Sequence, residues 1–435
     1  MKDNSAVIII DTGFSLESLR QAGKILAVIN VATGRVETGS PYLTWSENAD
    51  VLSVFAHDPL NHGSLVLKSL TALAPDLPVV LVRGYGYDQK MARTEFKHGR
   101  QVRAGWTEAY LAAVGVCRER GLASVANLSF GGYHHAVDGT GWESHCLAQV
   151  TGAGKSGHVV VAGAGAGDGS ALHASWRVET GGMEVAIASQ SGSTTYNFWS
   201  AAQTGSPHAN DWLLEVLLNG KLVAQELSGH IWPNLWNNRK QVTVRVEGVG
   251  QVRIRTSRFW SGDTEHGGSL LTGDTSGSRG LLSPGLGACD SDAGDSRQAL
   301  RGILASPGKS HSLMGATDSA TTPESLPVAE LLDPLRFDCW ISQTDSDAVF
   351  LTHRDVKSIA EPAIFPHVIA VGLESGSYAA DQNQPGSKPD LLLPGGGPIS
   401  FRLPEVVVKV ARMLATNPSL DVVAVRERLQ ADKVA

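Results

Sequence analysis

The sequence lacks a long apolar run. No stretch of about 18 consecutive apolar residues, the length that a helix needs to cross a bilayer, occurs anywhere in it. Its first five residues, MKDNS, do not contain the apolar core of a secretory signal. These absences argue against membrane insertion and against export. We therefore expect a cytoplasmic protein that has no membrane partner.

Cysteine is scarce and scattered. The four cysteines are Cys117, Cys146, Cys289 and Cys339. Zinc ribbons and redox dithiols need close pairs of cysteines, so the spacing excludes both kinds of site and predicts buried, reduced thiols. The adjacent His134 and His135 have no acidic residue or cysteine at metal-ligand spacing, and we interpret them as surface residues rather than metal ligands.

Positive charge is not in excess. The chain has 36 Lys and Arg residues against 43 Asp and Glu residues, which gives a net charge of −7, and it has no long basic run. A protein that binds nucleic acid through its phosphates needs clustered positive charge. Nucleic acid is therefore not an expected partner.

Two glycine-containing segments lack residues that nucleotide binding requires. The segment GKS at 154–156 would end a phosphate-binding loop, but Gln149 stands where the first glycine of that loop belongs. In the glycine-rich run at 163–169, the third glycine position of a dinucleotide fingerprint falls on Asp168 or Ser170. We expect no nucleotide cofactor.

Glycine, in contrast, is abundant. The 48 glycines lack the three-residue period of collagen and lie among apolar runs, in a chain that is 42% hydrophobic and 18% charged. This composition predicts a folded protein with many tight turns. At 435 residues, the chain is too long for one compact unit.

The N-terminal part alternates predicted strands and helices. Residues 6–10, AVIII, form an apolar, β-branched run that ends at Asp11-Thr12-Gly13, as expected of a buried parallel strand. Further strands are predicted at 79–82, 124–128 and 158–162, and helices at 64–73 and 107–120. This alternation predicts an α/β fold with a doubly wound, mostly parallel sheet.

The pattern changes after Gly169. Alternating apolar and polar residues, typical of antiparallel strands in a β-sandwich, occur at 183–188, 212–218, 241–246 and 251–256. Residues 261–325 are rich in Gly, Ser, Asp and Thr and predict a loop or linker. Strand and helix patterns return at 368–371, 390–393 and 401–415. We therefore predict one α/β domain in two parts, residues 1–169 and 360–435, with an inserted antiparallel β-sandwich and linker at 170–359.

Three residues suited to catalysis lie at the ends of predicted elements. Asp11 ends the first strand, His62 opens a helix, and Ser400 opens another helix after a glycine-rich turn. Nucleophilic acyl transfer needs these groups: His62 as general base, Asp11 to fix its tautomer, and Ser400 to attack a carbonyl. Each residue alone is also common at such a position for structural reasons. Their combination and their order along the chain favour the catalytic interpretation.

Longer segments around these residues carry a family resemblance. They are VIIIDTG at 7–13, NHGS at 61–64, SVANLSFGG at 124–132, FPHVIAVG at 365–372, KPDLLLPG at 388–395 and NPSL at 417–420. In this order they resemble the Asp, His and Ser motifs and neighbouring segments of the subtilisin-like serine peptidases, or subtilases. The β-rich region from residue 170 resembles the jelly-roll that some bacterial subtilases carry as an insert.

The resemblance implies a serine endopeptidase that acts on protein or peptide substrates. In such an enzyme, the backbone of Ser129, Phe130 and Gly131 would pair with an extended substrate segment, and a side-chain pocket would add specificity. Only ten residues precede Asp11, which resembles intracellular subtilases rather than secreted ones with a long propeptide. An unrestrained peptidase in the cytoplasm would be harmful, so a regulatory protein partner is a further hypothesis.

Two features of the family bear on cofactors and on side chains near the nucleophile. Subtilases often bind calcium, and calcium stays open here because the acidic residues form no loop pattern that could be assigned to it; we predict no other cofactor. Arg402, two residues after Ser400, could either select an acidic group or be a solvated helix side chain.

One position departs from the family pattern in a way that affects catalysis. Alignment of VVVAGAG at 159–165 with the family's strand places Ala166 where subtilases have the oxyanion-hole Asn. Loss of one oxyanion donor lowers kcat by about 10²- to 10³-fold. The chain is then either a weakened peptidase or a pseudo-peptidase that binds peptides as a scaffold. A deliberate replacement of Asn by Ala is a further explanation.

Overall fold

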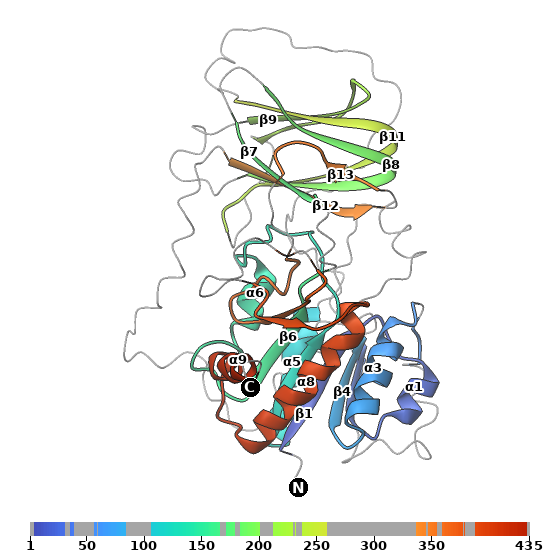
Figure 1. Ribbon diagram of the computed structural model, residues 1–435, viewed down its shortest axis with the longest axis vertical. Coiled ribbons are helices and arrows are strands. Elements are labelled where there is room, and N and C mark those ends of the chain that lie inside the picture. The colour runs from blue at the N-terminus through green and yellow to red at the C-terminus, as the bar shows by residue number, and fades with distance from the viewer. Residues whose placement is uncertain are drawn as a thin grey trace. The chain divides into compact units, whose positions relative to one another are not determined.

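The computed structural model describes residues 4–30, 35–38, 56–58, 60–83, 106–165, 171–178, 183–200, 212–228, 231, 237–258, 336–344, 347–354, 359–376, 378 and 388–432. These residues form two compact units (Figure 1). Unit 1 consists of the described residues within Met1–Ser170 and Val356–Ala435, and unit 2 of those between Ala171 and Asp355. The domain boundaries at 169/170 and 359/360 stay a prediction, because compactness does not show that a unit folds alone.

Unit 1 is built on an eight-stranded sheet. The strands lie in the order β15 (Leu391–Leu393), β14 (Ile369–Leu373), β6 (His158–Gly163), β5 (Ala123–Leu128), β1 (Ser5–Asp11), β4 (Pro78–Arg83), β2 (Lys24–Asn30) and β3 (Arg35–Thr38). Only β2 and β3 pair antiparallel, and all other neighbours are parallel. The predicted α/β sheet is confirmed, and β1, which carries Asp11, lies in its interior.

Helices cover both faces of this sheet. They are α1 (Leu16–Gln21), α3 (His62–Leu73), α5 (Trp106–Glu119), α6 (Trp142–Leu147), α8 (Ile399–Thr416) and α9 (Val422–Ala431). Side chains of β1 alternate between the two faces: Val7 and Ile9 pack with residues of α3 and α8, whereas Ile8 and Ile10 pack with residues of α5. Burial of both faces explains the continuous apolar run in β1. Of the helices in the described ranges, none is long and apolar enough to span a membrane.

Unit 2 is antiparallel. Its described strands are β7 (His173–Arg177), β8 (Met183–Ser200), β9 (Trp212–Leu218), β10 (Lys221–Leu227), β11 (Gln241–Arg258), β12 (Arg336–Thr344) and β13 (Val349–Phe350), in the order β10-β9-β11-β8-β12-β7 with β13 on β8. The sheet folds over on itself, because Trp212 of β9 meets Phe337 of β12 at a ring-centroid distance of 4.8 Å although two strands separate β9 from β12. The two halves enclose one apolar core, which confirms the predicted β-sandwich.

The segments predicted as strand at 241–246 and 251–256 both belong to one strand. Strand β11 runs through both segments and pairs with β8 along its length. Gly248 and Gly250 have φ values of 127° and 144°, a backbone region that glycine adopts far more easily than other residues. The two glycines therefore carry the chain through the middle of one long strand instead of ending it at a turn.

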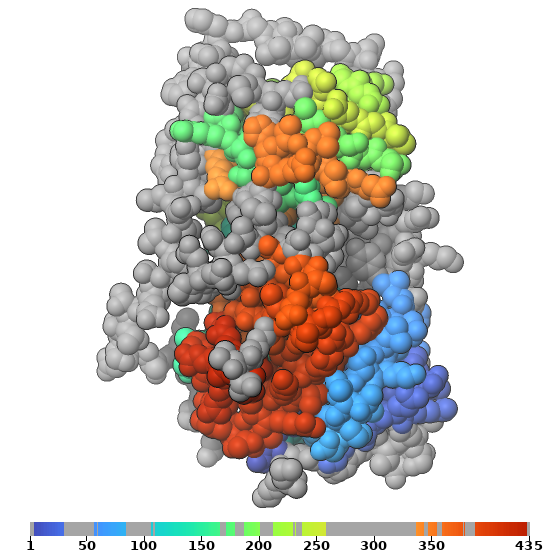
Figure 2. All heavy atoms as spheres, viewed as in Figure 1, coloured from blue at the N-terminus to red at the C-terminus, as the bar shows by residue number. Residues whose placement is uncertain are grey.

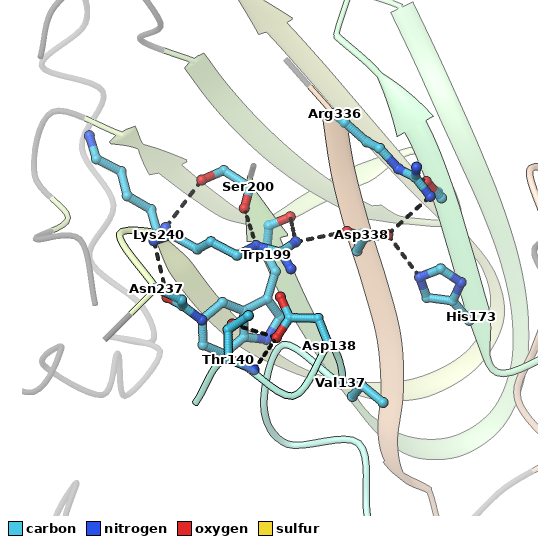
Figure 3. Close-up of polar contacts among 12 residues, drawn as sticks. Val137, Asp138, Thr140, His173, Trp199, Ser200, Asn237, Lys240, Arg336 and Asp338 are labelled. Carbon is cyan, nitrogen blue, oxygen red and sulfur yellow. Dashed lines mark hydrogen bonds and ion pairs between the residues drawn. The ribbon is translucent and has the colours of Figure 1, made fainter. Parts of the chain in front are cut away.

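Unit 2 buries a group of charged side chains (Figure 3). Asp338 of β12 accepts a hydrogen bond from Arg239 Nη2 at 2.7 Å, and His173 Nε2 lies 3.1 Å from its other carboxylate oxygen. Arg239 Nε also donates to the Ser200 carbonyl oxygen at 2.6 Å. Burial of a charge without partners would be strongly destabilising, so these contacts make the cluster tolerable and tie β7, β8 and β12 together.

The predicted burial of the thiols is confirmed where the structure describes them. Cys117, Cys146 and Cys339 are buried and form no disulfide. Burial raises the pKa of the Cys117 thiol to about 12, which keeps it protonated and unreactive at neutral pH. Cys289 and the predicted linker at 261–325 lie outside the described residues.

His158, buried at the start of β6, makes the stability of unit 1 depend on pH. Arg118 donates from Nε to His158 Nε2 at 3.0 Å, so this nitrogen is unprotonated, and Nδ1 lies 2.9 Å from the Ser124 hydroxyl. Burial, and secondly the charge of Arg118, lower the pKa of His158 from 6.5 to about 4. Between these values the unfolded chain binds a proton that the folded chain excludes. The free energy of unfolding therefore falls as the pH drops through this range.

Replacement of this histidine is expected to reduce the pH dependence. Chemical denaturation at pH 7 and pH 4.5 should show that the wild type loses about 2 kcal/mol more stability than His158→Gln. An equal loss in the two chains would contradict the assignment of a neutral, buried His158.

Candidate active site

Asp11 lies at the carboxyl end of β1 and is 1% exposed. Its Oδ1 accepts a hydrogen bond from the Thr12 N–H at 2.7 Å, and His62 Nδ1 lies 2.7 Å from the same oxygen. Asp11 Oδ2 is buried without a hydrogen-bond partner among the described residues. One oxygen of the carboxylate is thus held by the backbone and directed at the imidazole.

His62 is the first residue of α3, and its side chain is 27% exposed. The close approach of α3 to β1 depends on Gly63, because a Cβ there would lie 2.2 Å from the Gly13 carbonyl oxygen and 2.9 Å from Asp11 Cβ. With Nδ1 bonded to Asp11, the neutral ring carries its basic lone pair on Nε2, as a general base requires. The absence of a side chain at Gly63 thus allows the His62 imidazole to reach the Asp11 carboxylate.

The surroundings of His62 favour its protonated form. The hydrogen bond to Asp11 raises the pKa of His62 most, and the negative charges of Asp11 and Asp58 raise it further. Burial lowers the pKa, but by less than the sum of these effects. The ring is therefore a stronger base than an isolated histidine.

Ser400 lies in the first turn of α8, and its side chain is bonded to the end of β5. Ser400 Oγ donates to the Ser129 carbonyl oxygen at 2.9 Å, and Ser129 Oγ donates in return to the Ser400 carbonyl oxygen at 3.0 Å. The Asn127 amide donates to Ser129 Oγ at 2.8 Å. This chain of hydrogen bonds fixes the start of α8 against the carboxyl end of β5.

Helices α3 and α8 bring the first turn of α8, which contains Ser400, against His62. Phe401, the next residue along α8, packs on His62 with ring centroids 5.6 Å apart. In Figure 2 the light-blue residues of α3 adjoin the orange-red residues of α8. Asp11 and His62 are in direct contact, whereas the Ser400 hydroxyl is bonded to Ser129 and makes no hydrogen bond to His62 in the described structure.

The segment predicted to bind substrate continues directly from β5. Ser129 is buried, Phe130 packs edge-on against Trp106 at a ring-centroid distance of 5.5 Å, and Gly132 exchanges two backbone hydrogen bonds of 3.1 Å with Glu361. A Cβ on Gly131 would lie 2.9 Å from Ala360 Cβ, so this glycine allows the two segments to approach closely. A pocket borders the segment, and its lining includes Trp106, Phe130, Gly132, Glu143 and Glu361.

Of two further residues that the sequence singles out, Ala166 and Arg402, the structure describes only Arg402. Ala166 lies outside the described residues, which follow the chain from β6 only as far as Gly165. Arg402 forms two hydrogen bonds with the carboxylate of Glu405, and its Nη1 donates to the Pro394 carbonyl oxygen at 3.2 Å. Arg402 is therefore tied to its own helix and to the turn before Ser400, which favours a structural role over recognition of an acidic group.

The histidine pair shows no metal-ligand geometry. His135 Nε2 lies 3.0 Å from Glu143 Oε1. Within the part of the chain that is described, no three His, Cys, Asp or Glu side chains gather closely enough to hold a metal ion. The absence of any cofactor other than calcium stays a prediction.

Sequence reasoning missed two residues that support the site. Asn127 holds Ser129, and Asp58 contacts both the loop after β1 and the first turn of α3. A polar residue shortly before a predicted helix is the usual signal of a cap, so Asp58 could have been found from its position ahead of His62. Asn127 lies inside a buried strand, where the sequence alone offers no such signal.

Comparison with known proteins bears on the fold. No family model and no curated protein matches the chain. A solved structure, that of the Clostridium perfringens CspB protease, is similar to it with a TM-score of 0.58 over 98% of this chain and 86% of that chain, at 13% sequence identity. At this identity the similarity shows a common fold. That fold is the predicted subtilisin-like α/β architecture with an inserted antiparallel β-sandwich.

Proposed function

We propose that the chain is a serine peptidase that hydrolyses peptide bonds with Asp11, His62 and Ser400 as its catalytic triad. The observation that supports this most strongly is the 2.7 Å hydrogen bond between Asp11 and His62, formed at the carboxyl edge of the sheet beside the start of α8. The carboxyl edge is where open α/β sheets bind their ligands and carry out their chemistry. The similarity of the fold to a known protease is consistent with this function.

The reaction would follow from the acid–base properties of these groups. His62 Nδ1–H donates to Asp11, so Nε2 accepts the Ser400 proton as Oγ attacks the substrate carbonyl. The protonated His62 then donates this proton to the leaving amine, and water releases the acyl group from Ser400 by the same steps in reverse. For the attack, the Ser400 hydroxyl exchanges its bond to the Ser129 carbonyl oxygen for one to His62.

The oxyanion would be stabilised mainly by the start of α8. The first N–H groups of a helix have no acceptor within the helix and carry partial positive charge. The Ser400 N–H belongs to this turn. With Ala at position 166, no side-chain amide adds to it, so we propose that the activity is weakened.

The substrate would be an extended segment of a protein or peptide. Its backbone would pair with Ser129, Phe130 and Gly131 as an added strand. The aromatic and acidic side chains that line the neighbouring pocket would then contact a substrate side chain.

A second candidate function is peptide binding without catalysis, on a pseudo-peptidase scaffold. It is favoured by Ala166 and by the hydrogen bond of Ser400 Oγ to Ser129 instead of to His62. In this case the β-sandwich of unit 2 would serve as an interaction surface.

A fluorophosphonate probe distinguishes the two functions. We expect the probe to label the protein, and Ser400→Ala to abolish labelling because the nucleophile is removed. Ser419→Ala is a matched control, since Ser419 is exposed and bonded to Asn417 beyond the end of α8, and it should be labelled like the wild type. No labelling, even of Ala166→Asn, would support the scaffold.

A further inference from the structure

A second carboxylate, Asp58, lies beside the Asp11–His62 pair. Its Oδ1 accepts a hydrogen bond from the Thr12 hydroxyl at 2.7 Å. Its Oδ2 accepts two more, from the Ser64 N–H at 2.8 Å and from the Ser64 hydroxyl at 2.6 Å. Asp58 therefore joins the residue after Asp11 to the first turn of the helix that begins at His62.

Asp58 takes the place of the usual helix cap. Asn61 precedes α3, but its backbone is left-handed, with φ 55°, and its side chain forms no cap hydrogen bond. The N–H of Ser64 is instead satisfied by Asp58, and a carboxylate at this end of a helix is favoured by the helix dipole. Ser64 Oγ also accepts from the Ser15 N–H at 2.8 Å, so the same turn is bonded to the chain after β1.

Thr12 links Asp58 to Asp11. The Thr12 N–H donates to Asp11 Oδ1 at 2.7 Å, and the Gly63 N–H lies 3.3 Å from the Thr12 hydroxyl oxygen. That hydroxyl has one proton and two acceptors in reach, Asp58 at 2.7 Å and Asp11 at 3.3 Å. The shorter distance assigns the proton to Asp58. Asp58 thus orients Thr12, and the backbone N–H of Thr12 in turn orients the Asp11 carboxylate.

We propose that Asp58 is a positioning residue, whose carboxylate holds the loop after β1 and the start of α3 at the separation at which His62 bonds to Asp11. Its importance for catalysis rests on the proposed function, whereas its effect on the Asp11–His62 hydrogen bond does not. The alternative is a capping residue that stabilises α3 without affecting this hydrogen bond.

The charge of Asp58, like its hydrogen bonds, favours the interaction of His62 with Asp11. Among the residues that the structure describes, Asp11 of β1 is bonded to His62, the uncharged Phe401 ring of α8 packs on it, and the charge of Asp58 acts on it from the segment before α3. Asp11 raises the pKa of His62 most, and Asp58 adds a smaller Coulombic contribution. Removal of the Asp58 charge should therefore lower the pKa of His62.

The test compares Asp58→Asn with Asp421→Asn in the full chain. Asp421 is the matched control, because its carboxylate also caps a helix, accepting from the Ala424 N–H at 2.9 Å and from the Gly154 N–H at 2.6 Å, without contact to Asp11 or His62. The readouts are the downfield proton resonance of His62 Nδ1–H, the pKa of His62 from NMR titration, and the rate of fluorophosphonate labelling. All are measured well below the unfolding temperature of each variant.

We expect Asp58→Asn to weaken the His62 Nδ1–H resonance or to shift it upfield, and to lower the pKa of His62. Labelling should slow by about 10- to 100-fold because His62 is misaligned. Asp421→Asn should change none of the three. Thr12→Val, which removes the hydroxyl between the two carboxylates, is the second variant if Asp58→Asn does not fold, and it should alter the resonance in the same way.

An unchanged resonance and an unchanged His62 pKa in folded Asp58→Asn would overturn the proposal and leave Asp58 as a cap only. If neither the wild type nor Ala166→Asn is labelled, the proposed function fails, but the NMR comparison still decides the role of Asp58. The two failures are therefore distinguishable.

Discussion

Asparagine in place of Ala166 is expected to raise the rate of peptide hydrolysis by about 10²- to 10³-fold. The side-chain amide would supply a second hydrogen-bond donor to the oxyanion, which otherwise depends on the N–H groups at the start of α8. Because this bond forms with the charge that develops during the reaction, the gain should appear in kcat rather than in KM.

The measurement is steady-state hydrolysis of one chromogenic peptide by the wild type, Ala166→Asn and Ala166→Leu. Leucine has the same branched shape and the same number of side-chain heavy atoms as asparagine but no donor, so it controls for filling of the site. Equal rates for the Asn and Leu variants would contradict the assignment of position 166 to the oxyanion hole.

Asp11→Asn, made in the Ala166→Asn background, is expected to lower kcat by about 10⁴-fold. Asp11 Oδ1 accepts both the Thr12 N–H and the His62 Nδ1–H. An amide in its place can present an N–H to Nδ1, which moves the ring proton to Nε2 and leaves no base for Ser400.

The pH dependence of the hydrolysis rate provides a second test of the role of Asp11. A general base must be neutral, so the rate should rise with pH through the pKa of His62, which lies above 6.5 because of Asp11 and Asp58. In Asp11→Asn the largest cause of this shift is lost, and the midpoint should fall. A residual rate close to that of the parent, with an unmoved midpoint, would contradict the assigned role of Asp11.

The α/β fold could be predicted because its strands are buried on both faces. The run at 6–10 is apolar throughout, which distinguishes a central parallel strand from one with a solvated face, and β1 occupies such a position. The helix at 64–73 could be predicted from its apolar period, and α3 begins two residues earlier, at His62. Local pattern was sufficient for these elements because burial decides their composition.

The arrangement within the site depends on contacts between distant segments, which local pattern does not record. Ser400 was expected to face His62, but its hydroxyl is bonded to the carbonyl oxygen of Ser129, which is 271 positions away in the sequence. Asp58 could have been found as a cap candidate ahead of the predicted helix, but its contact with Thr12 joins segments 46 positions apart and has no local signal. In β11, Gly248 and Gly250 adopt positive φ values inside a continuous strand, which the sequence pattern does not reveal because glycine is also common at turns.

The most direct test of the central claim, that the chain is a peptidase using Ser400, is cleavage of an unfolded protein. Ala166→Asn and the double variant Ala166→Asn, Ser400→Ala are incubated with the substrate, and the new termini are identified by mass spectrometry. Internal cleavage by the first protein and none by the second is the predicted result. No cleavage by the first protein, or equal cleavage by both, would contradict the claim.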